Sequence, residues 1–354
     1  MKIALLNLPI DDNYGGNLQR FALVKVLQEM GHDVTHMLVM RKYTLWKKRI
    51  LPLMIKRAIL RFIFRKRVRI FAEHFAQKQN IANYNRIKPF YDKYIKHTEP
   101  INNCNTLKQY IFFDAYIVGS DQVWRKQIVQ PFPLKMFLWD YLPTSAKKIA
   151  YAVSLGNCKP ELDKVEAESL TKYYNQFTAV SVREKSALEV LDYYGWTKPK
   201  AEWLTDPTLL LKKEDYIDVI NKAETSRMNG DMFCYILDST QEKIDFIKHE
   251  ASSRNMKPFT TGLHKISIEQ WLRNFNDAKF IVTDSYHGFV FSMIFNKPVK
   301  LFLNEFRGNA RFDSLFELLG ISKDQECFDW NYINAILANE REKALNWLKG
   351  ALNA

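Results

Sequence analysis

The chain alternates short apolar runs with longer segments in which apolar residues recur at helical spacing. The first run, KIALLNL, leads through the turn-rich DDNYGGN into the helical pattern LQRFALVKVLQEMG. A short continuous apolar run is typical of a strand that is buried on both faces of a parallel sheet. Gly31 ends the helix, and DVTHMLVM predicts the next strand. The opening therefore predicts a βαβ unit.

The same alternation continues to the end of the chain. FDAYIVGSDQVW, KKIAYAVSLG and AVSVREK continue the first series, and MFCYILD, AKFIVTDS and KPVKLFL form a second one, with helical patterns between them. We therefore predict an α/β fold with two domains. The predicted ranges are 1–215, with a basic helical insertion at about 41–80, then 216–330, and 331–354 as a C-terminal helix that packs back across the domains.

The insertion carries nearly all of the net charge of +13. Between Val34 and Ala72 there are twelve lysines and arginines and no acidic residue. From Trp46 to Phe75 the pattern predicts one long helix on which four arginines recur at every fourth position as a basic stripe, Arg57, Arg61, Arg65 and Arg69. The arginines recur too often for a transmembrane span.

Three interpretations of this stripe remain open. It can be a solvated helix that packs on its own domain, a nucleic-acid contact or a contact with an anionic membrane surface. The apolar residues between the charges favour the membrane surface, and we expect no nucleic acid. The N-terminus lacks the pattern of a secretory signal, which predicts a cytoplasmic protein, peripheral on the inner face of the cytoplasmic membrane if the stripe binds lipid. The four scattered cysteines form no C-x-x-C pair, so we expect neither a zinc site nor disulfides.

The segment TDSYHGFVFSMIF is the most informative candidate site. An apolar strand runs directly into Asp284, Ser285 and His287, and Gly288 opens an apolar helix. A neutral histidine at a helix N-terminus could act as a base or hydrogen-bond donor near neutral pH. The alternative is a capping turn in which Asp284 or Ser285 caps the helix and His287 is merely half buried.

Four further segments place polar groups after predicted strands. Glycines and Asn17 in DDNYGGN could bring backbone amides to an anion, and Ser120 and Asp121 in VGSDQVW follow a buried strand. Arg183 in VREKS, and Arg307 and Arg311 in FRGNARF, could clamp a carboxylate or phosphate. Plain turns, helix caps, surface salt bridges and solvated loop charges are the alternatives. All of these segments lie at the carboxyl ends of strands, where α/β folds bind ligands.

Taken in order, these segments resemble the polysaccharide pyruvyl transferase family. The resemblance rests on NYGGNLQRFAL, IVGSDQVW, YAVSLG, SVREKSALEVL, DPTLLL, SIEQWL, AKFIVTDSYHGFVFSMIFNKPV and RGNARFDSLFELLG, and it covers about residues 3–320. The basic insertion matches no motif of the family, which leaves the acceptor in doubt but not the donor.

The resemblance implies a fold like that of the GT-B glycosyltransferases, with two Rossmann-like domains facing a cleft. It implies that phosphoenolpyruvate is the donor substrate, with no cofactor or metal, and that a glycan or lipid-linked sugar is the acceptor. His287 with Asp284 would be catalytic, and the remaining candidates would bind substrate: Gly16, Asn17, Ser120, Asp121, Arg183, Ser285, Arg307 and Arg311. The alternative is a glycosyltransferase of the same architecture that uses a nucleotide sugar.

Overall fold

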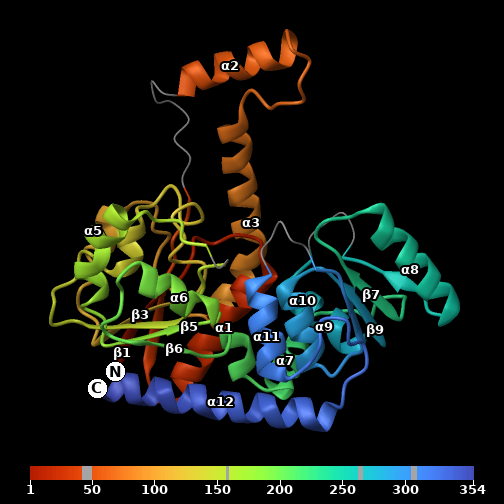
Figure 1. Ribbon diagram of the computed structural model, residues 1–354. Helices are drawn as coiled ribbons and strands as arrows, with labels where there is room; N and C mark the ends of the chain where they lie inside the picture. Colours follow the sequence, from red (N-terminus) through yellow and green to blue (C-terminus); the bar gives the residue numbers. More distant parts are fainter. Residues whose placement is uncertain (42–49, 157–158, 262–265, 304–308) are drawn as a thin grey trace.

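The computed structural model describes residues 1–41, 50–156, 159–261, 266–303 and 309–354. They form two parallel β-sheets that lie side by side and are covered by helices (Figure 1). The six-stranded sheet has the order β2 (Asp33–Met37), β1 (Lys2–Leu6), β3 (Ala115–Asp121), β4 (Lys147–Val153), β5 (Ala179–Val182) and β6 (Ala201–Trp203). The four-stranded sheet has the order β10 (Val299–Leu301), β9 (Phe280–Thr283), β7 (Met232–Tyr235) and β8 (Pro258–Phe259). The predicted α/β fold with two Rossmann-like units is confirmed.

The helices connect successive parallel strands, as the alternation of patterns predicts. In the first half they are α1 (Tyr14–Glu29), α2 (Ile50–Phe62), α3 (Ala72–Tyr94), α4 (Cys104–Leu107), α5 (Lys164–Tyr174) and α6 (Ser186–Tyr193). In the second half they are α7 (Lys213–Asn221), α8 (Gln241–Ser253), α9 (Ile268–Asp277), α10 (Tyr286–Ile294), α11 (Ala310–Leu319) and α12 (Trp330–Asn353). Two 3-10 helices, η1 (Leu134–Leu138) and η2 (Pro207–Leu210), add to the first half.

One hydrophobic cluster spans both halves, and each half also has a separate cluster of its own. A single cluster of buried side chains includes Ile3 of β1, Leu18 of α1, Ile281 of β9 and Val290 of α10. Tyr14 at the start of α1 stacks on Trp271 of α9, with ring centroids 5.4 Å apart. Helix α1 is therefore buried between the sheets rather than lying on one face of its own half.

Helix α12 crosses both halves on the opposite edge of the sheets from the strand carboxyl ends (Figure 1). Lys147, the first residue of β4, donates to the carbonyl of Leu352, and the indole of Trp347 donates to Glu202 of β6. Ile333 and Leu337, nearer its beginning, join the shared core. The predicted boundary between residues 215 and 216 falls inside α7, and the division into domains remains a prediction.

The basic segment forms an arm that projects from the body of the molecule (Figure 1). Helix α3 rises from the body, where its last turns are buried through Ile87, Phe90 and Tyr91, and α2 crosses its far end. We call residues 50–82 the arm. None of the described helices is both long and apolar enough to cross a bilayer.

The prediction of one long helix with four aligned arginines is wrong. Helix α2 ends at Phe62, and the amides of Phe64 and Lys66 donate to the carbonyls of Ile59 and Leu60, which turns the chain. Arg65 adopts a left-handed φ of 49°, which breaks the helical spacing between Arg61 and Arg69. Arg57 instead pairs with Glu73 of α3 at 2.7 Å, so attraction between the two helices replaces a continuous stripe.

Gly119 lets β3 and β4 approach closely, and its replacement tests the packing of the first sheet. An added Cβ would lie 2.1 Å from the carbonyl oxygen of Tyr151, and the φ of Gly119 is 157°. We expect Gly119→Ala to lower the free energy of unfolding by about 2–3 kcal/mol in urea titrations. Gly350→Ala in α12, where no atom lies within 4 Å of the added Cβ, should raise it by up to about 1 kcal/mol. Equal effects of the two changes would contradict this account.

Candidate active site

Loops after five strands meet where the two halves pack together. They bring together the N-terminus of α1 after β1, Asp121 at the end of β3, Arg183 after β5, Asp206 after β6 and His287 after β9. Because every strand is parallel to its neighbours, these carboxyl ends meet on one side of the sheets. Sequence-distant polar groups therefore gather between the halves.

Asp206 lies at the centre of this group. Its Oδ2 accepts hydrogen bonds from Arg183 Nη1 at 2.7 Å and from Gln19 Nε2 at 2.5 Å, and its Oδ1 accepts from the amide and hydroxyl of Thr208. His287 Nε2 lies 3.6 Å from Oδ2. We call Asp206, Arg183, Gln19, Thr208 and His287 the Asp206 cluster. It joins α1, the residue after β5, the beginning of η2 and α10, and its side chains are buried.

His287 sits between the two halves because of a glycine. It is the second residue of α10, whose N-cap Ser285 accepts from the amide of Gly288. A Cβ on Gly15 would lie only 2.0 Å from His287 Nδ1, so the imidazole occupies the space that a side chain on α1 would fill. At 3.6 Å, Nε2 is too far from Asp206 to be hydrogen-bonded, and it has no other partner among the described residues.

Two arginines flank the ring of Tyr286, beside His287. The guanidinium carbons of Arg183 and Arg311 lie 5.1 Å and 5.5 Å from its centroid, within reach of a cation–π contact. Arg183 also lies near Glu184 and Asp121, at 3.5 Å and 3.7 Å. Nε and Nη2 of Arg183 and Nε of Arg311 are buried and have no hydrogen-bond partner within the part of the chain that the structure describes. These N–H groups are the site's available donors to an anion.

The electrostatics of the cluster favour ionised groups despite burial. Burial alone raises the pKa of Asp206, but His287, Arg183 and Thr208 outweigh it and hold that pKa well below its usual range. Burial likewise lowers the pKa of Arg183, yet Asp206 and Glu184 raise it further. For Arg311, burial and the neighbouring Arg183 lower the pKa. The nearby Asp121 and Glu184 only partly offset this lowering.

The carboxylate of Asp284 has its partners within the second half and not in the Asp206 cluster. Its carboxylate accepts hydrogen bonds from the amides of Leu237 and Asp238 after β7, and it pairs with Lys243 of α8 at 2.7 Å. These contacts anchor the loop after β7 within the second half. The carboxylate predicted to be catalytic with His287 thus has a structural set of partners, while Asp206 is the carboxylate that faces the imidazole.

The other predicted site residues differ in how many hydrogen-bond partners their side chains have. Asn17 bonds to the carbonyls of Asp11 and Asn13 and accepts from Arg20 and Tyr91, so its amide holds the loop together. Ser120 is fully buried, and among the described residues its hydroxyl has no partner. Asp121 has a left-handed φ of 66°, and its Oδ2 would lie 3.5 Å from a Cβ on Gly16. Arg307 lies outside the described residues.

Sequence reasoning missed Asp206, Gln19 and Tyr286 as members of the site. DPTLLL enters the sequence analysis only as a segment of the family resemblance, although an aspartate before Pro207 follows a strand just as the other candidates do. Gln19 falls within an apolar helical pattern, so no local signal marks it. In the described part of the chain, no group of three or more histidine, cysteine or acidic side chains could hold a metal ion.

Asp206→Asn tests whether this carboxylate stabilises the buried Arg183. We expect the free energy of unfolding at pH 7 to fall by about 3 kcal/mol, because a buried guanidinium loses its charged partner. Asp218→Asn, which breaks an exposed helical pair, should change it by less than about 0.5 kcal/mol.

The pH dependence of the free energy of unfolding should also differ between Asp206→Asn and the wild type. Because the pKa of Asp206 is lowered by folding, its contribution is complete above the unfolded value of about 3.9 and is lost as the pH falls below that. Urea titrations between neutral pH and the acid limit should therefore show a shallower acid decline in Asp206→Asn than in the wild type. An unchanged slope would contradict the assignment.

Substitutions of two adjacent glycines test the position of the His287 ring. Gly15→Ala should displace the imidazole, whereas an added Cβ on Gly16 meets its nearest atom at an ordinary 3.5 Å. We expect the side-chain NMR signals of His287, identified by their absence in His287→Gln, to shift in Gly15→Ala and to stay in place in Gly16→Ala. Equal shifts in both variants would place the ring elsewhere.

Solved structures similar to the chain are distant in sequence. The UDP-GlcNAc 2-epimerase from Methanocaldococcus jannaschii is 10% identical, with a TM-score of 0.48 over 98% of this chain and 100% of that one. A putative UDP-N-acetylglucosamine 2-epimerase from Listeria monocytogenes is 9% identical, with a TM-score of 0.48 over 97% and 90% of the two chains. An α-glucosyltransferase in complex with UDP and DNA is 11% identical, with a TM-score of 0.44 over 98% and 95%. At TM-scores below 0.5, these likenesses do not bear on activity.

The family comparison is specific. No relative among curated proteins matches the chain. The model of the family described as polysaccharide pyruvyl transferase matches residues 13–304, which is most of the chain. The matched span runs from the N-cap of α1 past β10 and includes the whole Asp206 cluster, while Arg311 lies beyond it. The chain therefore belongs to the polysaccharide pyruvyl transferase family.

Proposed function

We propose that this transferase moves pyruvate from phosphoenolpyruvate onto a pair of hydroxyls of one sugar, in a surface polysaccharide or its lipid-linked precursor. The product is a ketal, and phosphate is released. The observation that carries the proposal is a pair of arginines beside Tyr286 and His287, the buried Arg183 and the partly buried Arg311. Among the described residues, Arg183 Nε and Nη2 and Arg311 Nε have no hydrogen-bond partner.

Phosphoenolpyruvate needs such donors because it carries a carboxylate and a phosphate in a small volume. Burying it without fixed cations would cost many kcal/mol, and guanidinium groups match the geometry of both anions. Arg183 is held rigidly by Asp206, while Arg311 has the weaker electrostatic support. We assign Arg311 to the donor's anionic groups and Arg183 to a fixed charge that stabilises the departing phosphate.

The reaction requires one proton transfer to carbon, the addition of one hydroxyl and the replacement of phosphate by a second hydroxyl. The methylene carbon takes a proton, one sugar hydroxyl bonds to the central carbon, and the second hydroxyl then replaces the phosphate at that carbon. The carbon–oxygen bond to phosphate breaks with its electron pair on phosphate, and the two hydroxyl protons balance the new methyl hydrogen and the protonation of phosphate. His287 exchanges the proton, and Asp206, whose Oδ2 lies 3.6 Å from His287 Nε2, acts as a positioning residue.

Ligand-induced thermal stabilisation tests the donor. We expect phosphoenolpyruvate to raise the melting temperature of the protein, because a ligand that binds only the folded state stabilises it by mass action. UDP-sugars should have no effect. Stabilisation by nucleotide sugars alone would replace this proposal with a nucleotide-sugar-dependent glycosyltransferase.

Two variants separate the assigned roles. His287→Ala should abolish turnover while phosphoenolpyruvate still stabilises the protein, because the ring acts on the proton rather than on the anion. Arg311→Ala should raise the KM for phosphoenolpyruvate by about tenfold or more, with a smaller effect on kcat, as expected for a lost charged hydrogen bond. Steady-state phosphate release with a sugar acceptor measures both, and the same prediction applies to Arg307→Ala. Identical behaviour of the histidine and arginine variants would contradict the division.

A further inference from the structure

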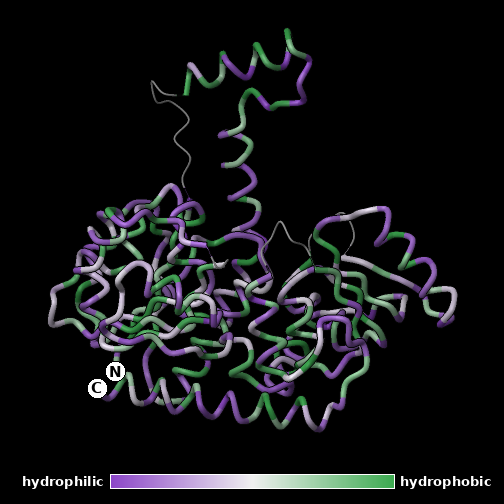
Figure 2. Tube along the Cα trace, in the orientation of Figure 1, coloured by the Kyte–Doolittle hydropathy of each residue, from purple (hydrophilic) through white to green (hydrophobic). Residues whose placement is uncertain are grey.

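The arm exposes an apolar surface that the body of the protein does not cover. Leu51, Ile55, Ile59 and Phe62 recur at helical spacing and lie on one face of α2, with exposed fractions from 43% for Ile59 to 72% for Phe62. No residue of α2 is buried. Figure 2 shows hydrophobic and hydrophilic positions alternating along α2, away from the body. Water-exposed apolar area of this kind marks a surface that meets a partner.

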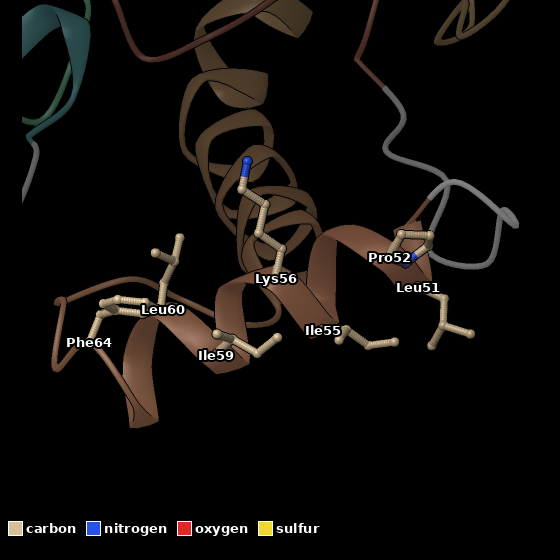
Figure 3. A pocket seen from close by; sticks show the side chains of 7 residues that line it. All are labelled: Leu51, Pro52, Ile55, Lys56, Ile59, Leu60 and Phe64. Carbon is tan, nitrogen blue, oxygen red and sulfur yellow. The ribbon is translucent and has the colours of Figure 1, made fainter.

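An open groove runs along α2. It is lined by Leu51, Pro52, Ile55, Lys56, Ile59, Leu60 and Phe64, so Lys56 is its one charged lining residue. Figure 3 shows Leu51, Ile55 and Ile59 side by side along one flank of the helix. The apolar surface is therefore continuous along the length of α2 and does not consist of isolated side chains.

The charge around this face has one sign. From Ile50 to Ala72 the sequence contains seven lysines and arginines and no acidic residue: Lys56, Arg57, Arg61, Arg65, Lys66, Arg67 and Arg69. Among the residues that the structure describes, Arg57 alone of these seven forms an ion pair, with Glu73. Arg61, Arg65, Lys66 and Arg67 are exposed. An apolar helix face bordered by exposed cations complements an anionic lipid surface, where acyl chains meet charged headgroups.

The arm stands on the same side of the molecule as the candidate active site. At its base, Tyr91 of α3 donates to Asn17 Oδ1, and Arg86 lies 3.8 Å from Asp12, both within the segment that follows β1. Gly15, which seats His287, belongs to that segment. Helix α12 lies on the opposite edge, where Lys147 begins β4. A surface that holds the arm would thus face the Asp206 cluster and not α12.

We propose that residues 50–71 dock the protein on the surface of an anionic lipid bilayer. The apolar face of α2 lies at the boundary between headgroups and acyl chains, and the exposed cations contact anionic headgroups. The proposal concerns binding alone and does not depend on the reaction proposed above.

Co-sedimentation of the full chain with vesicles tests the proposal without donor or acceptor. We expect binding to phosphatidylcholine vesicles that contain phosphatidylglycerol, much weaker binding to phosphatidylcholine alone, and loss of binding as salt rises. Arg61→Ala with Lys66→Ala should weaken binding roughly 25-fold, at about fivefold for each cation. The matched control, Lys248→Ala with Lys257→Ala, removes two exposed lysines from the second half and should change binding less than about twofold.

A double substitution of apolar residues distinguishes lipid binding from the binding of another partner. Ile59→Ser with Phe62→Ser keeps every charge and replaces two exposed side chains, so it should weaken vesicle binding by about tenfold or more while the protein stays folded. Equal binding to both kinds of vesicle, or equal loss in the lysine control, would overturn the proposal. The proposal would also be overturned if sedimentation equilibrium showed dimers that the arm variants lose while no vesicle binding is seen. Binding to duplex DNA in place of vesicles would overturn it as well.

Discussion

The ion pair between Arg183 and Asp206 is the interaction on which the site depends. Both side chains are almost completely buried, at 1% and 0% exposed, so neither charge could remain there without the other. The pair ties the end of β5 to the loop after β6, and Gln19 extends it to α1 of the same core. The imidazole of His287 then approaches the same carboxylate from the second half. One buried charge pair thus fixes the position of groups from four separate elements.

Much of the fold could be predicted because it follows from local patterns. Buried runs such as those at β1 and β9 mark parallel strands, and the position of His287 just beyond β9 placed it at the strand ends, where it and Arg183 both approach Asp206. The partners of each side chain could not be predicted in this way. Asp284 and Asp206 both follow strands, and only the packing of the two halves directs one to Lys243 and the other to His287. The way the two halves pack against each other depends on contacts between distant parts of the chain, and no local sequence pattern specifies it.

The arm shows the same limit for a different reason. Helical spacing of four arginines predicted one continuous stripe, but spacing describes a helix only while the helix continues. An attraction between Arg57 and Glu73, from residues 16 positions apart, draws α2 against α3. The cations therefore surround a short apolar helix and do not form a line along a long one. For lipid binding this difference matters, because the apolar face and the charges then occupy one compact end of the arm.

Helix α12 lies along one edge of the two sheets and leaves the edge with the strand carboxyl ends uncovered. Its hydrogen bonds to Lys147, Glu202 and Leu211 fasten it to the first half, and its Ile333 and Leu337 pack into the hydrophobic cluster that spans both halves. The arm projects from the other edge (Figure 1), where Arg183 follows the carboxyl end of β5. A fluorophore or surface linker attached to the solvent face of α12 would consequently stand far from both, and could hold or report on the molecule in a known orientation without obstructing either.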